Sequence, residues 1–429
     1  MKLHHSIFLV PCSILFLYSC SVSKQISRQA NKILINDTAI SQGHIGISIY
    51  EPATGKYWYE HDADKYFIPA SNTKLFTLYA GMKYLKDSLI GLRYFDTNDS
   101  TIIQSSGDPT FLHPDFKNQN TFSFLKKKNK ILHVFHKYIE YMGKGWAWDD
   151  YKEYYSAQRS DFPIYGNVLS VKRITKDSVL VQPPIFSKNV AIMEPLESGF
   201  EIVKTWDDNK AILLLDGKLD SSILPFRPNN VDGFLGDTLK KKIETDFGKY
   251  ERKKFSVFHS QPSDSLFKPM MFNSDNFFAE QTLLMVSDEQ LGYMSDEDMI
   301  DTLLKRDLKD VPQKPRWVDG SGLSRYNLFT PNSFIYILDK MRTEFGMERL
   351  KTILPTGGQG SLKNYFNTDA GSVYAKTGTI SNNSSLCGFL ITKKGKLLVF
   401  SLIANGYQTG VMPVRTAMEH FIQQLRERY

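Results

Sequence analysis

The stretch PASNTKLFTLYAGM, residues 69–82, decides the fold of this chain of 429 residues. Its polar beginning and apolar continuation predict a loop that runs into a helix, with Ser71 in the first turn. Residues three positions apart lie on the same face of a helix, with Cβ atoms ~5–6 Å from one another. The side chains of Ser71 and Lys74 are therefore predicted to meet at the start of this helix.

This pair is useful for catalysis only if the lysine is neutral. A serine hydroxyl is a weak nucleophile unless a base removes its proton, and an ordinary lysine, with a pKa of ~10.4, is protonated at neutral pH. Burial and a neighbouring cation both lower the pKa of a lysine, and a helix N-terminus directs N–H groups at developing negative charge. We therefore expect Ser71 to be a nucleophile, Lys74 its proton acceptor, and Lys376 the neighbouring cation.

Two further motifs stand later in the chain. The triplet Ser274-Asp275-Asn276 is followed by a helical run, and Lys376-Thr377-Gly378-Thr379 lies on a strand predicted over residues 373–380. Other copies of Ser-x-x-Lys occur, but only the copy at Ser71 opens a helix. Because Gly378 has no side chain, a peptide can lie against this strand and pair with its edge.

Both ends of the chain carry strand and helix patterns, whereas the middle differs from them in composition and periodicity. Alternating apolar residues predict strands at 44–50, 56–61, 373–380, 386–392 and 397–404, and helical spacing predicts helices over 26–40 and about 412–427. Short strand-like runs with many Pro and Asp residues fill positions 94–259. We therefore expect an α+β catalytic domain made of residues 21–93 and 260–429, interrupted over 94–259 by one insertion or two nested ones.

The three motifs together are marks of penicillin-binding proteins and class A β-lactamases. The chain resembles one class of these, the D-alanyl-D-alanine carboxypeptidases and endopeptidases called class C low-molecular-mass penicillin-binding proteins. Seven segments follow that family's order: 69–75 (PASNTKL), 106–110 (SGDPT), 145–150 (GWAWDD), 274–280 (SDNFFAE), 319–325 (DGSGLSR), 354–358 (LPTGG) and 375–379 (AKTGT). The 203 positions between Ser71 and Ser274 also suit this family, whereas class A β-lactamases have a much shorter gap. The resemblance implies a β-lactamase/transpeptidase-like fold, an antiparallel sheet flanked by helices, with a large domain inserted between the first and second motifs.

The same resemblance implies a role for each motif residue. Ser71 would form an acyl-enzyme with the penultimate D-Ala carbonyl, and Lys74 would accept its proton. Ser274 would pass a proton to the leaving amine, and Asn276 would hold the substrate amide. Positive charge would come from Lys376, and the terminal carboxylate would bind to Thr377 and Thr379. The backbone N–H groups of Ser71 and Thr379 would form the oxyanion hole, and residues 319–325 would support the site.

The first twenty residues are predicted to be an export signal. Lys2 supplies a positive beginning, and the apolar run over 7–17 is too short to span a membrane, which takes ~20 residues. Residues 17–20, Leu-Tyr-Ser-Cys, resemble a bacterial lipobox, in which the Cys receives lipid. We expect an exported, periplasmic protein that is attached to a membrane only through lipid on Cys20. Plain secretion, with Cys20 incidental, is the alternative.

Composition and spacing disfavour other kinds of site. The formal net charge of +7 is spread along the chain, and its densest basic run, 126–130, suits a solvated loop, so we expect no nucleic-acid partner. His133 and His136 have no carboxylate or Cys partner nearby and are predicted to pack within a helix, so we expect no metal and no cofactor. Asp149-Asp150 suits a surface turn better than a pair of catalytic carboxylates.

The leading hypothesis is a serine DD-peptidase that acts on peptidoglycan stem peptides and is acylated by β-lactams as covalent inhibitors. The balance between carboxypeptidase and endopeptidase activity stays open, because it depends on the width of the pocket for the leaving residue. Two alternatives also remain: a serine β-lactamase or esterase on the same scaffold, and a non-catalytic envelope lipoprotein that binds wall peptide. A binding module would have no need of Lys74 beside Ser71, which argues against the last.

Overall fold

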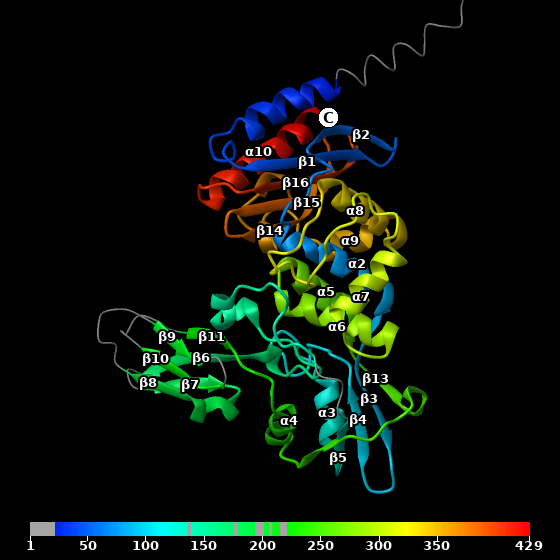
Figure 1. Cartoon of the computed structure of the whole chain (residues 1–429), viewed down its shortest axis with the longest axis vertical. Coiled ribbons are helices and arrows are strands. Elements are labelled where there is room, and N and C mark those ends of the chain that lie inside the picture. Colours follow the sequence, from blue (N-terminus) through cyan, green and yellow to red (C-terminus); the bar gives the residue numbers. More distant parts are fainter. Residues whose placement is uncertain (1–21, 135–138, 176–177, 194–200, 206–207, 215–220) are drawn as a thin grey trace, which may run out of the picture.

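The computed structural model describes residues 22–134, 139–175, 178–193, 201–205, 208–214 and 221–429. An antiparallel sheet of five strands, in the order β14-β15-β16-β1-β2, stands at one end of an elongated molecule (Figure 1). Its strands are β1 (His44–Glu51), β2 (Lys56–His61), β14 (Val373–Ile380), β15 (Asn383–Ile391) and β16 (Leu397–Asn405). The five strands predicted from alternating apolar residues are confirmed.

The two ends of the chain meet in the middle of this sheet. Strand β1 pairs with β16 from His44 to Tyr50, for example Ile47 opposite Leu402. Side chains alternate between the two faces of a strand, so Phe400 and Leu402 enter one apolar core while Val399 and Ile403 enter the other. Because helices cover both faces, the sheet is apolar on both sides and its central strands are buried almost throughout.

Two helical segments cover the first face of the sheet. They are a segment over residues 22–35, which ends in the π-helical turn η1 (Asn31–Ile35), and α10 (Val411–Arg428). Ile26, Ala30 and Leu34 are fully buried in the same core as Phe421 and Leu425. Burial of a large apolar side chain stabilises a fold by about 1.5–3 kcal/mol, so this cluster fixes both segments on the sheet.

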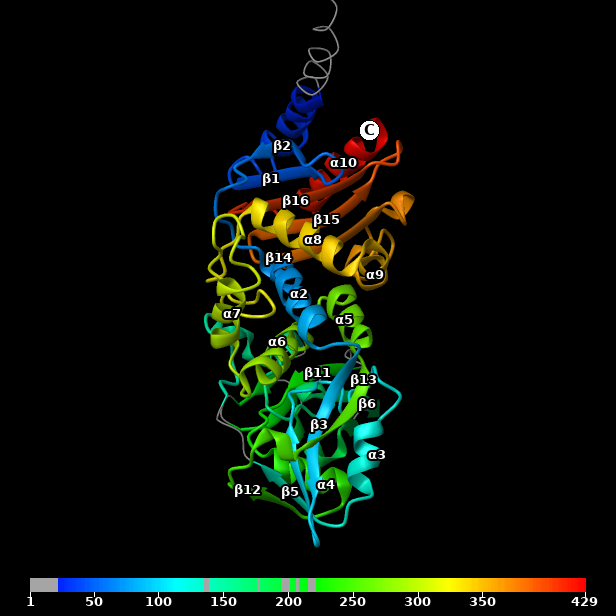
Figure 2. The ribbon, with the colours of Figure 1, turned by 90° about the vertical axis from the view of Figure 1, so that its right-hand side faces the viewer.

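A layer of helices covers the second face and reaches towards the middle of the molecule (Figure 2). Its members are α2 (Lys74–Tyr84), α5 (Ser263–Phe272), α6 (Asn276–Leu291), α7 (Asp296–Lys305), α8 (Pro331–Phe345) and α9 (Met347–Ile353). Every residue of α2 from Lys74 to Met82 is buried, because the helix lies among α5, α6 and α8. A polar side chain on such a helix must find hydrogen-bond partners inside the protein.

The inserted region forms the other end of the molecule (Figure 2). Strands β3 (Ser88–Asp96) and β13 (Ser256–Pro262) pair with one another at the junction and belong to a second sheet, β12-β5-β4-β3-β13. The other three strands of that sheet are β4 (Thr101–Ser105), β5 (Ile131–Val134) and β12 (Ile243–Asp246). The boundaries expected near 93 and 259 pass through β3 and β13, and the division into domains stays a prediction.

Two sheets of three strands lie within the inserted region, in the orders β11-β6-β7 and β8-β10-β9. Their strands are β6 (Val168–Thr175), β7 (Ser178–Gln182), β8 (Val190–Met193), β9 (Glu201–Lys204), β10 (Ala211–Leu214) and β11 (Ser221–Pro225). Two helices accompany the sheets, α3 (Asn120–Lys126) and α4 (Val231–Leu239). The helix predicted around His133 is wrong, since His133 lies in β5, where its Nδ1 atom is 2.7 Å from Asp232 Oδ1. His136 lies outside the described residues.

A buried ion cluster joins the inserted region to helix α6. Arg93 of β3 donates a hydrogen bond of 2.6 Å to Asp288 and another to Glu289 near the end of α6. Arg252, which precedes β13, donates to Asp288 at 3.2 Å and to Glu289 at 2.9 Å. The Arg93 side chain is only 2 % exposed, so its charge depends on these carboxylates. The cluster therefore holds the second sheet in a fixed position on α6.

Candidate active site

Ser71 lies on a short 3₁₀ turn, η2 (Ala70–Thr73), that leads directly into α2. Its neighbour Ala70 has a φ of +48°, a left-handed conformation that is rare for a residue with a side chain. The strained turn brings the Ser71 hydroxyl to 3.0 Å from the Lys74 Nζ atom. The contact expected from the spacing of the two residues is therefore present.

The Lys74 amine sits among three oxygen atoms. Besides Ser71, Nζ is 2.6 Å from Asn276 Oδ1 and 2.7 Å from the Ser321 carbonyl oxygen. A neutral amine has two N–H groups and one lone pair. The two carbonyl oxygens can therefore accept the N–H groups, which leaves the lone pair to accept the proton of the Ser71 hydroxyl.

Burial lowers the pKa of Lys74 to about 8, because the charged form loses its hydration in this fully buried position. Three carboxylates oppose this effect and raise the pKa: Asp319, Asp275 and Glu280. Burial, one of the two causes expected from the sequence, is thus the largest cause of the shift, and the three carboxylates outnumber the neighbouring cation that was also expected. With a pKa of about 8, about one Lys74 amine in ten is neutral at pH 7, far more than for an ordinary lysine.

Ser274 approaches the same region from the connection between α5 and α6. Its φ of +57° is left-handed, so the backbone is held in a strained conformation at this position. The Ser274 hydroxyl accepts a hydrogen bond of 2.8 Å from Lys376 Nζ, which also donates to the Thr377 carbonyl oxygen at 2.6 Å. Burial holds the pKa of Lys376 well below its ordinary value, and the positive charges of Lys74 and Arg415 lower it further.

Asn276 links the lysine to the inserted region. Its Oδ1 atom accepts the hydrogen bond from Lys74, and its Nδ2 atom donates to the Tyr155 carbonyl oxygen at 2.9 Å. Lys74 and Asn276 stand 202 positions apart in the chain, so the fold alone brings them together. The Asn276 amide is oriented by these two partners, and its contact with a substrate amide stays a prediction.

Strand β14 passes close to the serine turn because Gly378 has no side chain. A Cβ atom at this position would lie 2.6 Å from the Pro69 carbonyl oxygen and 3.1 Å from the Ser71 nitrogen. Gly378 is thus needed so that β14 can pack against η2. This role adds to the one expected from the sequence, which was to leave the strand edge free for a peptide. β14 is indeed the edge strand of its sheet. Thr377 and Thr379 alternate with Lys376 and Gly378, and therefore face the other side.

A loop organised by Asp319 supports the lysine from behind. The fully buried Asp319 carboxylate accepts hydrogen bonds from the backbone of Gly322 and Ser324 at 2.8 and 2.7 Å, and from Trp146 Nε1 at 3.0 Å. Gly322 is needed here, since a Cβ atom would lie 1.9 Å from the Ala70 carbonyl oxygen. This supporting role was expected for residues 319–325, although the organising carboxylate was not identified from the sequence.

Two buried charged residues were missed by the sequence analysis. Glu280 of α6 accepts a hydrogen bond of 2.8 Å from the Ser321 backbone, whose carbonyl oxygen faces Lys74. Burial raises the pKa of Glu280 to about 7. Arg159 of the inserted region is 3.4 Å from Glu280 and 2.5 Å from Asp296. Glu280 was within a motif segment, but the sequence contains no local signal for Arg159.

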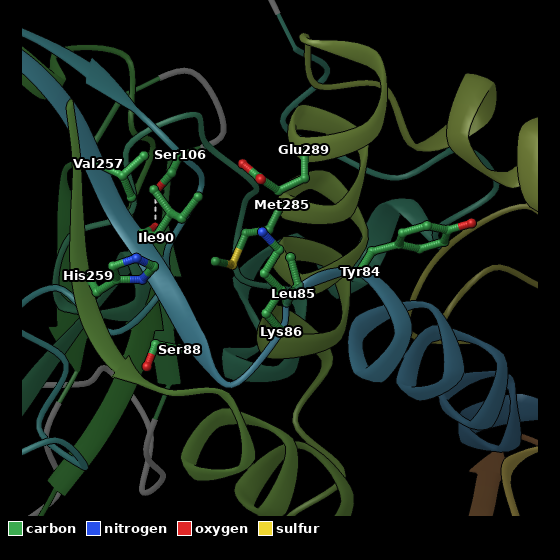
Figure 3. Close-up of a pocket in the computed structure, with 10 residues that line it drawn as sticks. All are labelled: Tyr84, Leu85, Lys86, Ser88, Ile90, Ser106, Val257, His259, Met285 and Glu289. Atoms are coloured by element: carbon green, nitrogen blue, oxygen red, sulfur yellow. Dashed lines mark hydrogen bonds between the residues drawn. The ribbon is translucent and has the colours of Figure 1, made fainter. Parts of the chain in front are cut away.

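A cavity of about 180 Å³ lies apart from these residues, between α6, the end of α2 and the strands β3 and β13 (Figure 3). One dashed contact in it is the 2.5 Å hydrogen bond from the Ser106 hydroxyl to the Ile90 carbonyl oxygen. None of the predicted site residues is among those that line it: Tyr84, Leu85, Lys86, Ser88, Ile90, Ser106, Val257, His259, Met285 and Glu289. The cavity belongs to the junction of the two halves, and the candidate catalytic groups lie at the other end of α2.

The remaining sequence predictions have mixed outcomes. Asp149 and Asp150 lie in a 3₁₀ turn, Trp148–Lys152, with no buried residue, as expected for a surface position. Cys20 and the predicted export signal lie outside the described residues. Within the parts of the chain that the structure describes, every helix is too short or too polar to span a lipid bilayer. Within the same parts, no three His, Cys, Asp or Glu residues gather where they could hold a metal ion.

Comparison with known proteins places the chain in one family. The model of the D-Ala-D-Ala carboxypeptidase 3 (S13) family matches residues 27–179 and 233–426. D-alanyl-D-alanine carboxypeptidase DacB of Haemophilus influenzae is 27% identical over 183 residues, which are 40% of this chain and 37% of that protein. Carboxypeptidase DacB of Mycolicibacterium smegmatis is 31% identical over 158 residues, 34% of either chain. The alignments thus span little more than a third of these relatives.

Solved structures share the fold over nearly the whole chain. Penicillin binding protein 4 (dacB) of Haemophilus influenzae superposes with a TM-score of 0.74 at 19% identity, over 93% of this chain and 98% of that one. A penicillin G-acylated predatory endopeptidase of Bdellovibrio bacteriovorus superposes with a TM-score of 0.50 at 16% identity, over 89% and 92%. The α+β fold with an insertion between the first and second motifs is therefore confirmed. With a family model that matches most of its length, the chain belongs to the D-Ala-D-Ala carboxypeptidase 3 (S13) family of peptidases.

Proposed function

We propose that this protein is a serine DD-peptidase that cleaves stem peptides of peptidoglycan through an acyl-enzyme on Ser71. The observation that carries the proposal is the Lys74 amine, which is buried, has a pKa lowered to about 8, and lies 3.0 Å from the Ser71 hydroxyl. A lysine with only a packing role would not need to stand within hydrogen-bond distance of a serine hydroxyl. The family membership supports the same activity.

Acylation would begin with transfer of the Ser71 proton to Lys74. The Ser71 oxygen then attacks the carbonyl carbon of the penultimate D-Ala, and the carbonyl oxygen becomes an oxyanion. The backbone N–H groups of Ser71 and Thr379 would stabilise that charge, and the close approach of β14 at Gly378 supports this arrangement. General-base removal of a proton typically contributes 10²- to 10⁴-fold in rate.

Departure of the terminal residue needs a proton on its nitrogen. Ser274 would supply it, because its hydroxyl is held by Lys376 at 2.8 Å and is positioned by the left-handed backbone. The oxyanion then re-forms the carbonyl, the C–N bond breaks, and the amine leaves with the proton from Ser274. The proton that Lys74 took from Ser71 would pass on to Ser274, so the hydroxyl is restored and the charge balances. In deacylation, water would attack the acyl carbonyl and give one proton to Lys74, which returns it to the Ser71 oxygen as the C–O bond breaks. The shortened peptide leaves as a carboxylic acid, which loses the second proton of the water to solvent.

The substrate would be a peptide whose last two residues are D-amino acids, with the second either free or part of a cross-link. Thr377 and Thr379 would receive the carboxylate of the leaving residue. β-Lactams would acylate Ser71 as covalent inhibitors, because their strained amide imitates the same bond. We also propose that the protein is exported to the periplasm and is held at a membrane by lipid on Cys20, as its lipobox predicts.

Two measurements on the purified protein test this function. Penicillin should add its own mass to the peptide that contains Ser71, and a peptide ending in D-Ala-D-Ala should release D-Ala. Ser71→Ala should abolish both and keep its thermal unfolding transition. Rapid penicillin turnover without D-Ala release would assign the protein to the β-lactamases instead. Absence of both labelling and release would favour a binding protein. Purified cross-linked and uncross-linked muropeptides would then separate endopeptidase from carboxypeptidase activity.

A further inference from the structure

Arg415 brings a positive charge with no assigned role to the edge of the candidate site. It is half-buried near the beginning of α10, and its Nη2 atom donates a hydrogen bond to the Thr379 hydroxyl of β14. Its Nη1 atom lies 3.4 Å from the Tyr365 hydroxyl, and the guanidinium lies 5.5 Å from the centre of the Tyr365 ring. Tyr365 thus holds the guanidinium against the strand.

The charge of Arg415 has no anionic partner among the described residues. Other arginines of the described residues do form ion pairs there, for example Arg93 with Asp288 and Arg426 with Asp369. Arg415 lies near enough to Lys376 for its charge to lower the pKa of that amine. A guanidinium without a carboxylate partner, beside a lysine whose pKa is already lowered, favours a negatively charged ligand at this place.

The position relative to the nucleophile fits one particular anion. Thr377 and Thr379 face the side of β14 that α10 covers, as shown by Ala375 and Val414 in one apolar core. The Ser71 turn lies against the same strand at Gly378. In a peptide, the carboxylate of the last residue is only three bonds from the carbonyl carbon that precedes it, within the ~3.8 Å spacing of successive Cα atoms.

We propose that Arg415 binds the free α-carboxylate of the residue that leaves, together with the hydroxyls of Thr377 and Thr379. The planar fork of a guanidinium matches a carboxylate and can donate two parallel hydrogen bonds. Arg415 is then a specificity-determining residue: it selects peptides whose leaving nitrogen carries a neighbouring carboxylate. The inference rests on the proposed function, because that function supplies the substrate.

The test compares two substrates that differ only at this carboxylate. A peptide ending in D-Ala-D-Ala is presented as the free acid and as the C-terminal amide, and kcat/KM is measured for the wild type and for Arg415→Ala. The variant should lose about 10- to 100-fold on the acid, the range that one hydrogen bond to a charged group supplies. It should stay within about twofold on the amide, so that the preference for the acid collapses. Arg415→Lys should keep part of the preference, as a point charge without the fork.

Arg428→Ala is the matched control, because it removes the same charge from the far end of the same helix. It should leave the preference unchanged, and thermal unfolding should show each variant folded. Equal losses on acid and amide, with a shifted pH profile, would mean that Arg415 acts only through Lys376 and would overturn the inference. If the wild type releases D-Ala but Arg415→Ala keeps the preference for the acid over the amide, the role of Arg415 is refuted while the proposed function stands. A wild type that releases no D-Ala would refute the proposed function, and this inference with it.

Discussion

Replacement of Lys74 by Ala should remove most of the reactivity of Ser71 towards penicillin. Among the described residues, the Lys74 amine is the only group that the structure shows hydrogen-bonded to the Ser71 hydroxyl, at a distance of 3.0 Å. Loss of a general base costs about 10²- to 10⁴-fold in rate, which corresponds to about 2.7–5.4 kcal/mol of transition-state stabilisation. Lys83→Ala, at the other end of the same helix α2, is the matched control and should keep the wild-type acylation rate.

In the wild type, the pH dependence of the acylation rate should follow the titration of the Lys74 amine. With a pKa of about 8, roughly one Lys74 in ten is neutral at pH 7 and roughly nine in ten at pH 9. The acylation rate should therefore rise about tenfold between these pH values, and the residual rate of the Lys74→Ala variant should not follow that rise. The sign is fixed, because only the neutral amine can accept the serine proton.

Fluorescent penicillin, mixed with protein at a series of pH values and quenched at set times, gives the acylation rate directly. Two results would refute the reasoning. One is a wild-type rate that stays flat from pH 7 to pH 9. The other is a Lys74→Ala variant that acylates within about fivefold of the wild type while it remains folded, since a lysine with only a packing role would give such a mild effect.

Three further predictions concern the surroundings of the site. Gly378→Ala should push β14 away from the Pro69 carbonyl and lower stability by about 1–3 kcal/mol, seen as a shift of the urea midpoint together with loss of penicillin labelling. Asp319→Ala leaves several buried N–H groups without a partner and should cost at least about 3 kcal/mol in the same titration, whereas an unchanged midpoint would exclude the organising role of this carboxylate. The mature protein should begin at a lipid-modified Cys20, so mass spectrometry of the N-terminal peptide should find the lipid, and an unmodified Cys20 or another start would contradict the lipobox.

The parts of the site that could be predicted from the sequence are those whose residues lie within a few positions of one another in the chain. Ser71 and Lys74 are neighbours on one turn, so their contact follows from helix geometry. The two sheet-forming ends were also predictable, because alternation of apolar residues marks each strand separately. In contrast, His133 was assigned to a helix because an isolated apolar run with histidines three apart fits either a helix or a short strand.

The residues that were missed act across long distances in the chain. Arg159 reaches Glu280 over 121 positions, and Arg415 reaches Thr379 from a different element. A single charged residue carries no periodicity, so its burial and its partners become visible only when the elements are packed. Asp319 was predictable only in part. Its glycine-rich segment indicated a tight loop, but it did not indicate which backbone N–H groups would donate hydrogen bonds to the carboxylate.

The pairing of β1 with β16 has a consequence for the order of events during synthesis. The ribosome completes β1 more than three hundred residues before its partner, because residues 44–51 must wait for residues 397–405. Until then β1 and β2 form only an isolated hairpin, which is marginally stable in water. Contacts of such long separation make folding slow. Ser71 thus acquires its strand and Lys376 only after residues 373–380 have been synthesised, so a product truncated before them would expose unpaired strand edges and carry no assembled nucleophile.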